Sequence, residues 1–442
     1  MDKKIIVVAG VVVVAGGFIA HSMAGKSVEK QIQQNLAALE ADQDIAVSNV
    51  QTHKGWGNTS VTADIKAVAE PGLGGELAME VGYLSREADG LMTFNGEVLE
   101  GVVDFTTELG NGKRNYTFSA DELTAAEYGM VFEQTEGNGY VDAEREHFAL
   151  NMLTQRMDLQ YTSSHMQISG LQTELEHNVA PQDGEGRSHV RFAVEGAALT
   201  VNSRGEPLEA VRLGESEIRN TATLDGDTLT SQLYFAASDA VFMGSEPGHA
   251  ELDITAEGLN YEAFQAVSEA LEQSLETIDD EATLPAQRQQ ALTHDLQETL
   301  VEQAHTLLAH SPSLHLNTLT IDATLPMIGR ATTDLSGSLA FDGDGLPQDA
   351  TNALLADINA DMRRTVVATQ GRPAMSAREA QAEFAPRVSA ELTVTQLPDT
   401  IVGELPPGLQ ALLANGDAPH TFAWKNSQPL YNGEPLQQAL PQ

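Results

Sequence analysis

Three histidines have a spacing that could support metal chemistry. His305, His310 and His315 recur every five residues, and imidazole is a common protein ligand for metal ions. A spacing of five does not align side chains on one face of a helix. Pro312 also interrupts the segment that holds them. We therefore predict isolated surface histidines rather than a metal site.

Two short acidic motifs resemble the beginning of a calcium-binding loop. They are Asp225-Gly226-Asp227 and Asp342-Gly343-Asp344. A calcium loop needs further oxygen ligands and a terminal glutamate at fixed positions. After Asp344 those positions are wrong, because Pro347 intrudes and the glutamate is missing. We predict that both motifs form hairpin turns.

No sequence signature of an enzyme is present. The chain has no nucleophile elbow, phosphate loop, dinucleotide fingerprint or HExxH motif, and it has no cysteine. We therefore predict no catalytic residue, no metal ligand and no cofactor, and the ligand-binding residues are unknown. A hydrolase that uses dispersed carboxylates stays an alternative, because two such residues meet only in three dimensions. With 64 acidic residues, no particular pair is favoured.

Two tryptophans could stack on a ligand. Trp56 lies between Gly55 and Gly57, and Trp424 lies near the C-terminus. Large aromatic side chains more often anchor a hydrophobic core. We expect both tryptophans to be core residues.

The charge balance excludes one class of partner. The chain of 442 residues has 24 basic and 64 acidic residues, a net charge of -40. Such a field repels nucleic acid, so we exclude DNA and RNA as partners. The acidic residues are spread evenly, which is typical of a halophile protein. This composition describes a habitat and not an activity.

The N-terminal segment predicts a membrane anchor. Residues 5–25 contain no charged side chain and follow Lys3 and Lys4. As a helix this segment spans about 31 Å, enough to cross a bilayer. The lysines favour a cytoplasmic N-terminus, so we expect a single-pass inner-membrane protein with its body in the periplasm. A cleaved signal peptide, cut after Ser22-Met23-Ala24, is the alternative.

The remaining sequence alternates between two periodicities. Residues 26–44 have the spacing of an amphipathic helix, and from residue 45 the apolar residues recur with a period of two. Asp89-Gly90, Asn138-Gly139 and similar dipeptides predict hairpin turns. The capping-box spacing of Ser119 and Glu122 predicts a short helix within this region.

A helical pair interrupts the β pattern. Asn260 can cap one helix and Pro285 can begin a second, which ends near Pro312. The predicted organisation is an anchor (1–25), an amphipathic helix (26–44), a β-rich region (45–259), a helical hairpin (260–310) and a second β-rich region (311–442). Further helical stretches are expected at 348–356 and 375–384. The predicted fold class is α+β, mainly an antiparallel β meander with an embedded helical hairpin and an N-terminal transmembrane helix.

A long meander has two ways to bury its apolar side. It can pack on helices as an ordinary sheet, or it can curl into an open groove with an apolar floor. In the second case four leucines of the helical hairpin would face the groove: Leu271, Leu275, Leu292 and Leu296. That arrangement would suit a carrier of lipid or another apolar ligand.

Several landmarks resemble one bacterial family. They are the lysine-flanked anchor, the Gly55-Trp56 pair, the stretch SPSLHLNTLT at 311–320, and the C-terminal Trp424-Lys425-Asn426 and Tyr431-Asn432-Gly433-Glu434-Pro435. In this order they resemble the YdgA-like family of envelope proteins, a domain of unknown function. Its members typically end in a tryptophan-containing strand and an NGKP-like turn, where Glu434 replaces the common lysine. The resemblance implies an inner-membrane anchor, a periplasmic β-rich body and no established catalytic residue.

The leading functional hypothesis follows from these observations together. We expect a membrane-anchored envelope protein that acts without catalysis, through binding or scaffolding. Its expected partners are the membrane, through the N-terminal helix, and a lipid or other envelope proteins. The sequence does not identify the ligand.

Overall fold

The structure is a computed structural model. It describes residues 45–67, 73–82, 87–96, 98–108, 114–126, 129–142, 147–161, 163–178, 185–203, 206–279, 286–325, 329–415 and 418–439. These residues divide into two compact units. The first comprises the described residues up to 180, with 187–219 and 236–248, and the second comprises 181–186, 220–235 and 249–442 within the described ranges.

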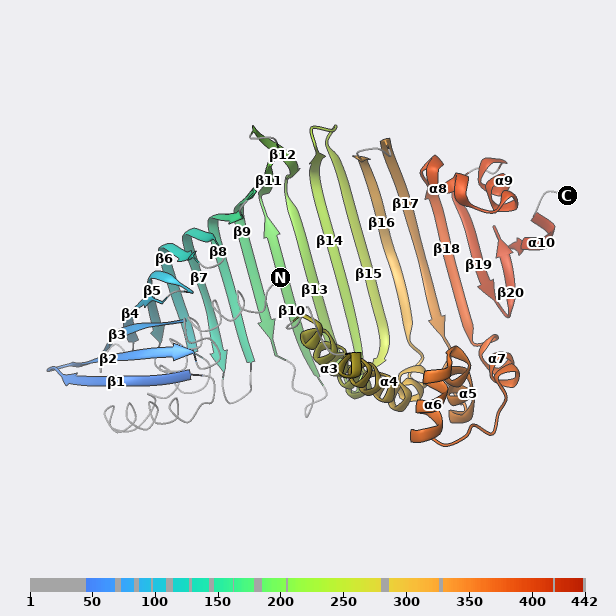
Figure 1. Cartoon of the computed structure of the whole chain (residues 1–442), viewed down its shortest axis with the longest axis horizontal. Helices are drawn as coiled ribbons and strands as arrows, with labels where there is room; N and C mark the ends of the chain where they lie inside the picture. Colours follow the sequence, from blue (N-terminus) through green and yellow to red (C-terminus); the bar gives the residue numbers. More distant parts are fainter. Residues whose placement is uncertain are drawn as a thin grey trace. The chain divides into compact units, whose positions relative to one another are not determined.

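Strands β1 to β9 of the first unit form an antiparallel meander in which each strand pairs with the next (Figure 1). The strands of this unit are β1 (Ile45–Lys54), β2 (Asn58–Ala67), β3 (Gly74–Gly82), β4 (Glu87–Asn95), β5 (Glu100–Glu108), β6 (Arg114–Ala125), β7 (Met130–Asp142), β8 (His147–Tyr161), β9 (Ser164–His177), β10 (Glu185–Val194), β11 (Gly196–Ser203) and β12 (Glu206–Leu213). Strand β9 pairs with β11 along one half and with β10 along the other.

Strict alternation explains why these segments are strands. In β3, Leu77, Met79 and Val81 are buried, whereas the residues between them are exposed. The buried side chains of β2 to β9 meet in one core, which includes Phe94 and Leu171. A period of two places all apolar residues on one face of the sheet, so this unit has one buried face and one solvent face.

Two predicted turns and one predicted helix are wrong. Gly90 and Gly139 lie inside β4 and β7, where a Cβ at either position would overlap the ring of Phe105 or Tyr116 on the neighbouring strand. The glycine makes room for a ring rather than for a turn. The capping-box residues near Ser119 lie in β6 and pair with both neighbouring strands. Long-range pairing outweighs a local helix signal there.

The second unit contains a second antiparallel series. Its strands are β15 (Gly248–Asn260), β16 (Ser313–Leu325), β17 (Gly329–Phe341), β18 (Val388–Gln396), β19 (His420–Lys425), β20 (Gln428–Tyr431) and β21 (Glu434–Pro435), each paired with the next. Strands β13 (Ser216–Asp225) and β14 (Thr228–Phe242) contribute residues to both units.

Helices connect these strands. They are α3 (Tyr261–Asp279), α4 (Ala286–Ala309), α5 (Gln348–Ile358), α6 (Ala360–Thr369), α7 (Ala377–Phe384), α8 (Asp399–Glu404), α9 (Pro407–Asn415) and α10 (Leu436–Ala439). Figure 1 shows α3 to α7 gathered at one end of the strands of this unit. The Oδ1 atom of Asn260 accepts a hydrogen bond of 3.0 Å from the amide of Ala263, which confirms the predicted cap of α3.

The mainly antiparallel β architecture with inserted helices is therefore confirmed, and α3 and α4 lie where the helical spacing predicts them. Helices α6, α8 and α9 were not predicted. The predicted anchor (1–25) and amphipathic helix (26–44) lie outside the described residues. Among the described helices, none is both long and apolar enough to cross a membrane.

Candidate functional site

One face of the second unit is apolar across six consecutive strands, β15 to β20. Cross-strand pairing aligns its side chains in three rows. We call these residues the apolar face: Ala256, Leu314, Leu339, Ala390, Trp424 and Pro429; Ile254, Leu316, Gly337, Leu392, Phe422 and Tyr431; Leu252, Leu319, Leu335, Val394 and His420. None of the seventeen is Asp, Glu, Lys or Arg.

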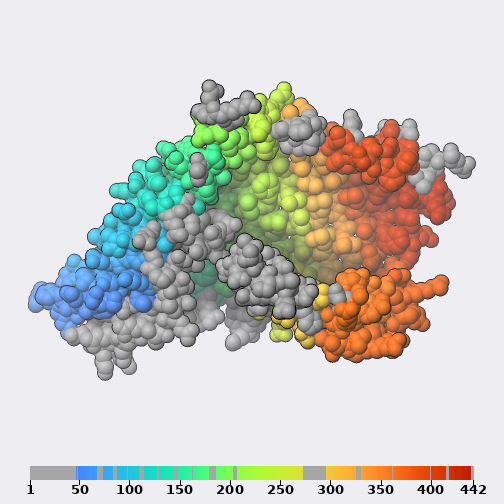
Figure 2. Space-filling model, viewed as in Figure 1, coloured from blue at the N-terminus to red at the C-terminus, as the bar shows by residue number. Residues whose placement is uncertain are grey.

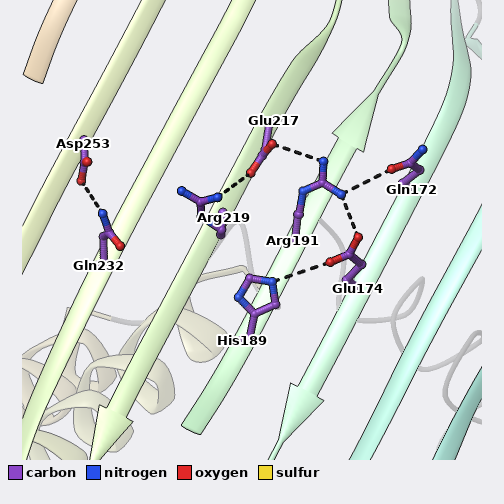
Figure 3. Close-up of polar contacts among 8 residues, drawn as sticks. All are labelled: Gln172, Glu174, His189, Arg191, Glu217, Arg219, Gln232 and Asp253. Atoms are coloured by element: carbon purple, nitrogen blue, oxygen red, sulfur yellow. Dashed lines mark hydrogen bonds and ion pairs between the residues drawn. The ribbon is translucent and has the colours of Figure 1, made fainter.

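The opposite face of the same strands is polar. Gln232 donates a 2.9 Å hydrogen bond to Asp253 (Figure 3), and Asn317 donates one of 3.1 Å to the same carboxylate. Lys425 contacts Glu391 at 2.7 Å. Strand β16 has a bulge between Leu316 and Leu319. The extra residue in the bulge leaves both leucines on the same face of the sheet. The strands are therefore amphipathic along their whole length.

The helices that the structure describes cover the apolar face only at its margins. At one margin Phe341 and Val388 pack against α4, α5 and α7 in a cluster that includes Phe384. At the other, the Tyr431 hydroxyl donates to the carbonyl of Leu412 in α9 at 3.2 Å. That hydroxyl also receives a 2.8 Å hydrogen bond from His420 Nδ1, so both polar groups of the face are satisfied internally.

The middle of the apolar face is exposed. Leu339 is 50% exposed, Leu314 46%, Leu392 41% and Trp424 37%. Leu314 pairs directly with Leu339, and Ala390 joins Leu339 to Trp424 in the same row. Figure 2 shows the strands of this unit, from yellow-green to red, uncovered beyond the helices. Large contiguous apolar patches on a protein surface generally mark a binding site.

The three histidines have different hydrogen-bond partners. His305 Nδ1 lies 3.4 Å from the Thr351 hydroxyl, and His315 Nε2 lies 3.1 Å from that of Ser313. His310 has other partners. Within the described part of the chain, no group of three or more His, Asp or Glu residues is placed to hold a metal ion.

His310 instead joins three structural elements. Its Nδ1 donates to the carbonyl of Thr306 at 3.0 Å, and its Nε2 contacts the Asp227 carboxylate at 3.0 Å. The Asn260 amide lies 3.2 Å from the same Nε2. The hydrogen bond with Asp227 raises the pKa of His310 and lowers the pKa of Asp227. This ion pair ties the end of α4 to the turn between β13 and β14.

The acidic motifs form turns. Gly226 has a positive φ of 64° in the turn between β13 and β14, as predicted. At the other motif the Asp344 amide donates to the Asp342 carboxylate at 3.1 Å, and Arg387 donates to the carbonyl oxygens of Asp342 and Asp344. This second turn leads into α5 rather than into a hairpin.

The predicted burial of the tryptophans is wrong. Trp56 is fully exposed at the tip of the hairpin between β1 and β2, because Gly55 and Asn58 close a turn too short to fold its side chain inward. Trp424 is half-exposed on the apolar face. Of the leucines expected to face a groove, Leu271 is 46% exposed and Leu296 is half-buried. The side chains of Leu275 and Leu292 lie outside those the structure describes.

A groove lined by both polar and apolar residues lies on the solvent face of the first unit. It has a volume of about 1030 Å³ and crosses β2 to β9. Glu80 and Asp89 are paired directly across two strands there, and Thr106 donates to Asp89 at 2.8 Å. The general acid of a glycosidase is a carboxyl group whose pKa is raised by an apolar environment. Both of these carboxylates are instead exposed to solvent. Glu80 and Asp89 therefore lack the environment of a glycosidase acid.

An ion-pair network in the described part of the first unit links neighbouring strands. Arg191 contacts Glu174 at 2.8 Å and Glu217 at 3.3 Å, and it donates to Gln172 at 3.3 Å (Figure 3). Arg219 contacts the other oxygen of Glu217 at 3.3 Å. The hydrogen bond with Glu217 is the largest cause of the raised pKa of Arg191. The network holds neighbouring strands together.

Sequence reasoning missed the apolar face as a site. The period of two in β16, β17 and β18 is visible in the sequence, and it predicts that one side of these strands is apolar. It does not show that Leu339 and Leu392 stay exposed, because exposure depends on where α5, α7 and α9 pack.

The comparisons with known proteins give one family. The model of a bacterial protein family of unknown function, DUF945, matches residues 72–403. No curated protein and no solved structure matches the chain.

Proposed function

The chain belongs to the DUF945 family of bacterial proteins of unknown function, and from its apolar face we propose that it binds the acyl chain of a lipid. It would act without catalysis, as a holder or carrier in the bacterial envelope. The observation behind this proposal is the exposed middle of a face that has no charged residue across six strands.

The chemistry of the face favours a hydrocarbon occupant. Protein partners generally need about one hydrogen bond per 100–200 Å² of interface. The backbone groups of these strands are used in the ladders, and the two polar side chains, His420 and Tyr431, bond to each other. Little capacity for polar contact remains, and an acyl chain needs none.

The size of the face is also suitable. Six strands at about 4.8 Å apart extend roughly 24 Å from the first to the last. One leaflet of a bilayer has a hydrocarbon thickness of about 15 Å, half of the ~30 Å core. An acyl chain can therefore lie across the strands with most of its length in contact with side chains.

The location belongs to the same proposal. The apolar segment 5–25 behind Lys3 and Lys4 supports an inner-membrane anchor with the body in the periplasm. The YdgA-like assignment rests on the motifs described above, and the match over residues 72–403 supports its coarser part, a bacterial domain of unknown function. Scaffolding of envelope proteins is the second candidate, and dispersed-carboxylate hydrolysis is less favoured because Glu80 and Asp89 are exposed.

The test is to identify what the protein holds. The full chain would be extracted from bacterial membranes in a mild detergent, and native mass spectrometry would compare it with an unrelated single-pass protein extracted in the same way. We expect one or two lipids bound per chain in excess of that control. Vesicles that contain a fluorescent phosphatidylcholine would then measure lipid transfer to unlabelled vesicles.

Two results would contradict the proposal. One is a lipid content equal to that of the control protein, together with no transfer. The other is a stable dimer or a protein complex that buries Leu339 and Trp424, which would favour scaffolding.

A further inference from the structure

A segment of the second unit is basic, although the protein as a whole is strongly acidic. Four arginines lie on α6, on the loop that follows it and at the start of α7: Arg363, Arg364, Arg372 and Arg378. All four are exposed, and residues 362–378 include no acidic side chain. The whole chain has 24 basic and 64 acidic residues, so the charge of this segment is opposite in sign to the net charge of the chain.

Local structure turns these charges outward. Asn359 caps α6 through a 2.7 Å hydrogen bond from the Met362 amide to its side chain. Met362 and Val366, four residues apart, pack against Val301 of α4. Because that face is buried, Arg363 and Arg364 project from the other side. The Arg363 guanidinium is further positioned by a 3.1 Å hydrogen bond to the carbonyl of Ala356.

Two large apolar side chains accompany the arginines. Ile358, the last residue of α5, is 62% exposed, and Val367 of α6 is 47% exposed. Arginines beside exposed aliphatic residues on a short helix are typical of segments that lie in a membrane interface. Figure 1 shows α6 with α5 and α7 at the end of the strands, away from their centre.

We infer that the segment 358–378, in which Asp361 is the single acidic residue beside four arginines, docks on a bilayer surface that contains anionic phospholipids. The arginines pair with lipid phosphates, while Ile358 and Val367 enter the interface. The net charge of -40 means that the rest of the protein is repelled by such a surface. Docking is therefore confined to this segment and determines which end of the second unit contacts the membrane. The inference goes beyond acyl-chain binding, because it rests on charge and not on the apolar face.

The absence of cysteine allows a single label in the full chain. Ala368 is exposed beside Val367, and Ser389 is exposed on the polar face of β18. A nitroxide at Ala368→Cys or Ser389→Cys would be measured in nanodiscs of pure phosphatidylcholine and in nanodiscs with 30% phosphatidylglycerol. Any N-terminal anchor is the same in every sample, so it does not affect the comparison.

We expect only the Ala368→Cys label to respond to anionic lipid, gaining access to oxygen and losing access to a water-soluble relaxing agent. Replacing three arginines (Arg364→Gln, Arg372→Gln, Arg378→Gln) should lower the equilibrium constant for docking by roughly 100-fold, since each basic residue near an anionic surface contributes about fivefold. The matched control, Arg187→Gln, Arg212→Gln and Arg330→Gln, removes the same charge elsewhere and should dock like the parent.

Each other result overturns the inference. If the accessibility of the Ala368→Cys label is the same with and without phosphatidylglycerol, the partner of these arginines is an acidic protein and not a membrane. Equal losses in the two triple variants would mean that total charge matters and not this segment. Far-ultraviolet circular dichroism verifies that each variant is folded. Bound lipid measured by mass spectrometry is a separate readout, so failure of docking and failure of the carrier proposal remain distinguishable.

Discussion

Replacement of Leu339 by glutamine tests the carrier proposal at its centre. Leu339 is 50% exposed in the middle of the apolar face. Full burial of a leucine side chain contributes about 1.5–3 kcal/mol, so an acyl chain that covers the exposed half gains roughly 0.8–1.5 kcal/mol from it. Burying a glutamine amide without a partner adds a cost of about 0.5–2 kcal/mol.

The two effects together predict weaker binding by roughly 1.5–3 kcal/mol, or about 10- to 100-fold. The assay is titration of each full-length variant with a fluorescent sixteen-carbon fatty acid. Ser338→Gln is the matched control, because Ser338 neighbours Leu339 but lies on the polar face. Leu339→Met retains volume and apolarity and should bind like the parent.

The reasoning is refuted if the Leu339→Gln and Ser338→Gln variants bind the fatty acid with equal affinity while both are folded. It is also refuted if Leu339→Met loses binding as strongly as Leu339→Gln, since shape rather than apolarity would then decide. Thermal melts of each variant separate a loss of binding from a loss of folding.

Three further predictions concern stability. Because the pKa of His310 is raised in the folded protein, its ion pair with Asp227 stabilises the fold below the unfolded pKa of histidine, and this stabilisation is lost as pH rises through the folded pKa. The lowered pKa of Asp227 has the opposite effect at acid pH, where stability is lost as pH falls through the folded pKa of that carboxyl group. Melting temperatures from pH 3 to pH 9 should fall at both the acid and the alkaline end, and His310→Asn should remove the fall at the alkaline end. Trp56→Ala should change the free energy of unfolding by less than about 0.5 kcal/mol, whereas Phe94→Ala, at 2% exposure, should cost about 3–5 kcal/mol; equal losses would contradict the structure. A net charge of -40 predicts a higher melting temperature in 1 M than in 0.05 M NaCl, and a flat response would indicate compensated carboxylates.

The sequence predicts those features that short stretches of chain determine. The cap at Asn260 and the period change that follows it place α3 correctly. Asn432 and Gly433 have positive φ angles of 48° and 83°, so the chain forms the C-terminal turn that the resemblance to the YdgA-like family implies. In each case neighbouring residues settle the conformation.

Features that depend on distant residues were not predictable in this way. Gly139 looks like half of a hairpin turn, but the ring of Tyr116, one strand away, occupies the space beside it. Trp56 looks like a core residue by type, but the tight turn at Gly55 holds it away from the sheet. The apolar face itself follows from alternation, whereas its exposure depends on the packing of α5, α7 and α9.

The charge statistics of the chain argue that the apolar face is retained for an occupant. Charged residues make up 20% of the sequence, so seventeen average positions would hold about three, and the apolar face has none. High salt strengthens apolar association and screens the repulsion between acidic molecules. In such surroundings an uncovered apolar face would join copies of the protein to one another. The proposed acyl chain would remove that hazard by covering Leu314, Leu339 and Leu392. Delipidated protein should therefore self-associate more as salt rises, while lipid-loaded protein should remain monomeric by light scattering.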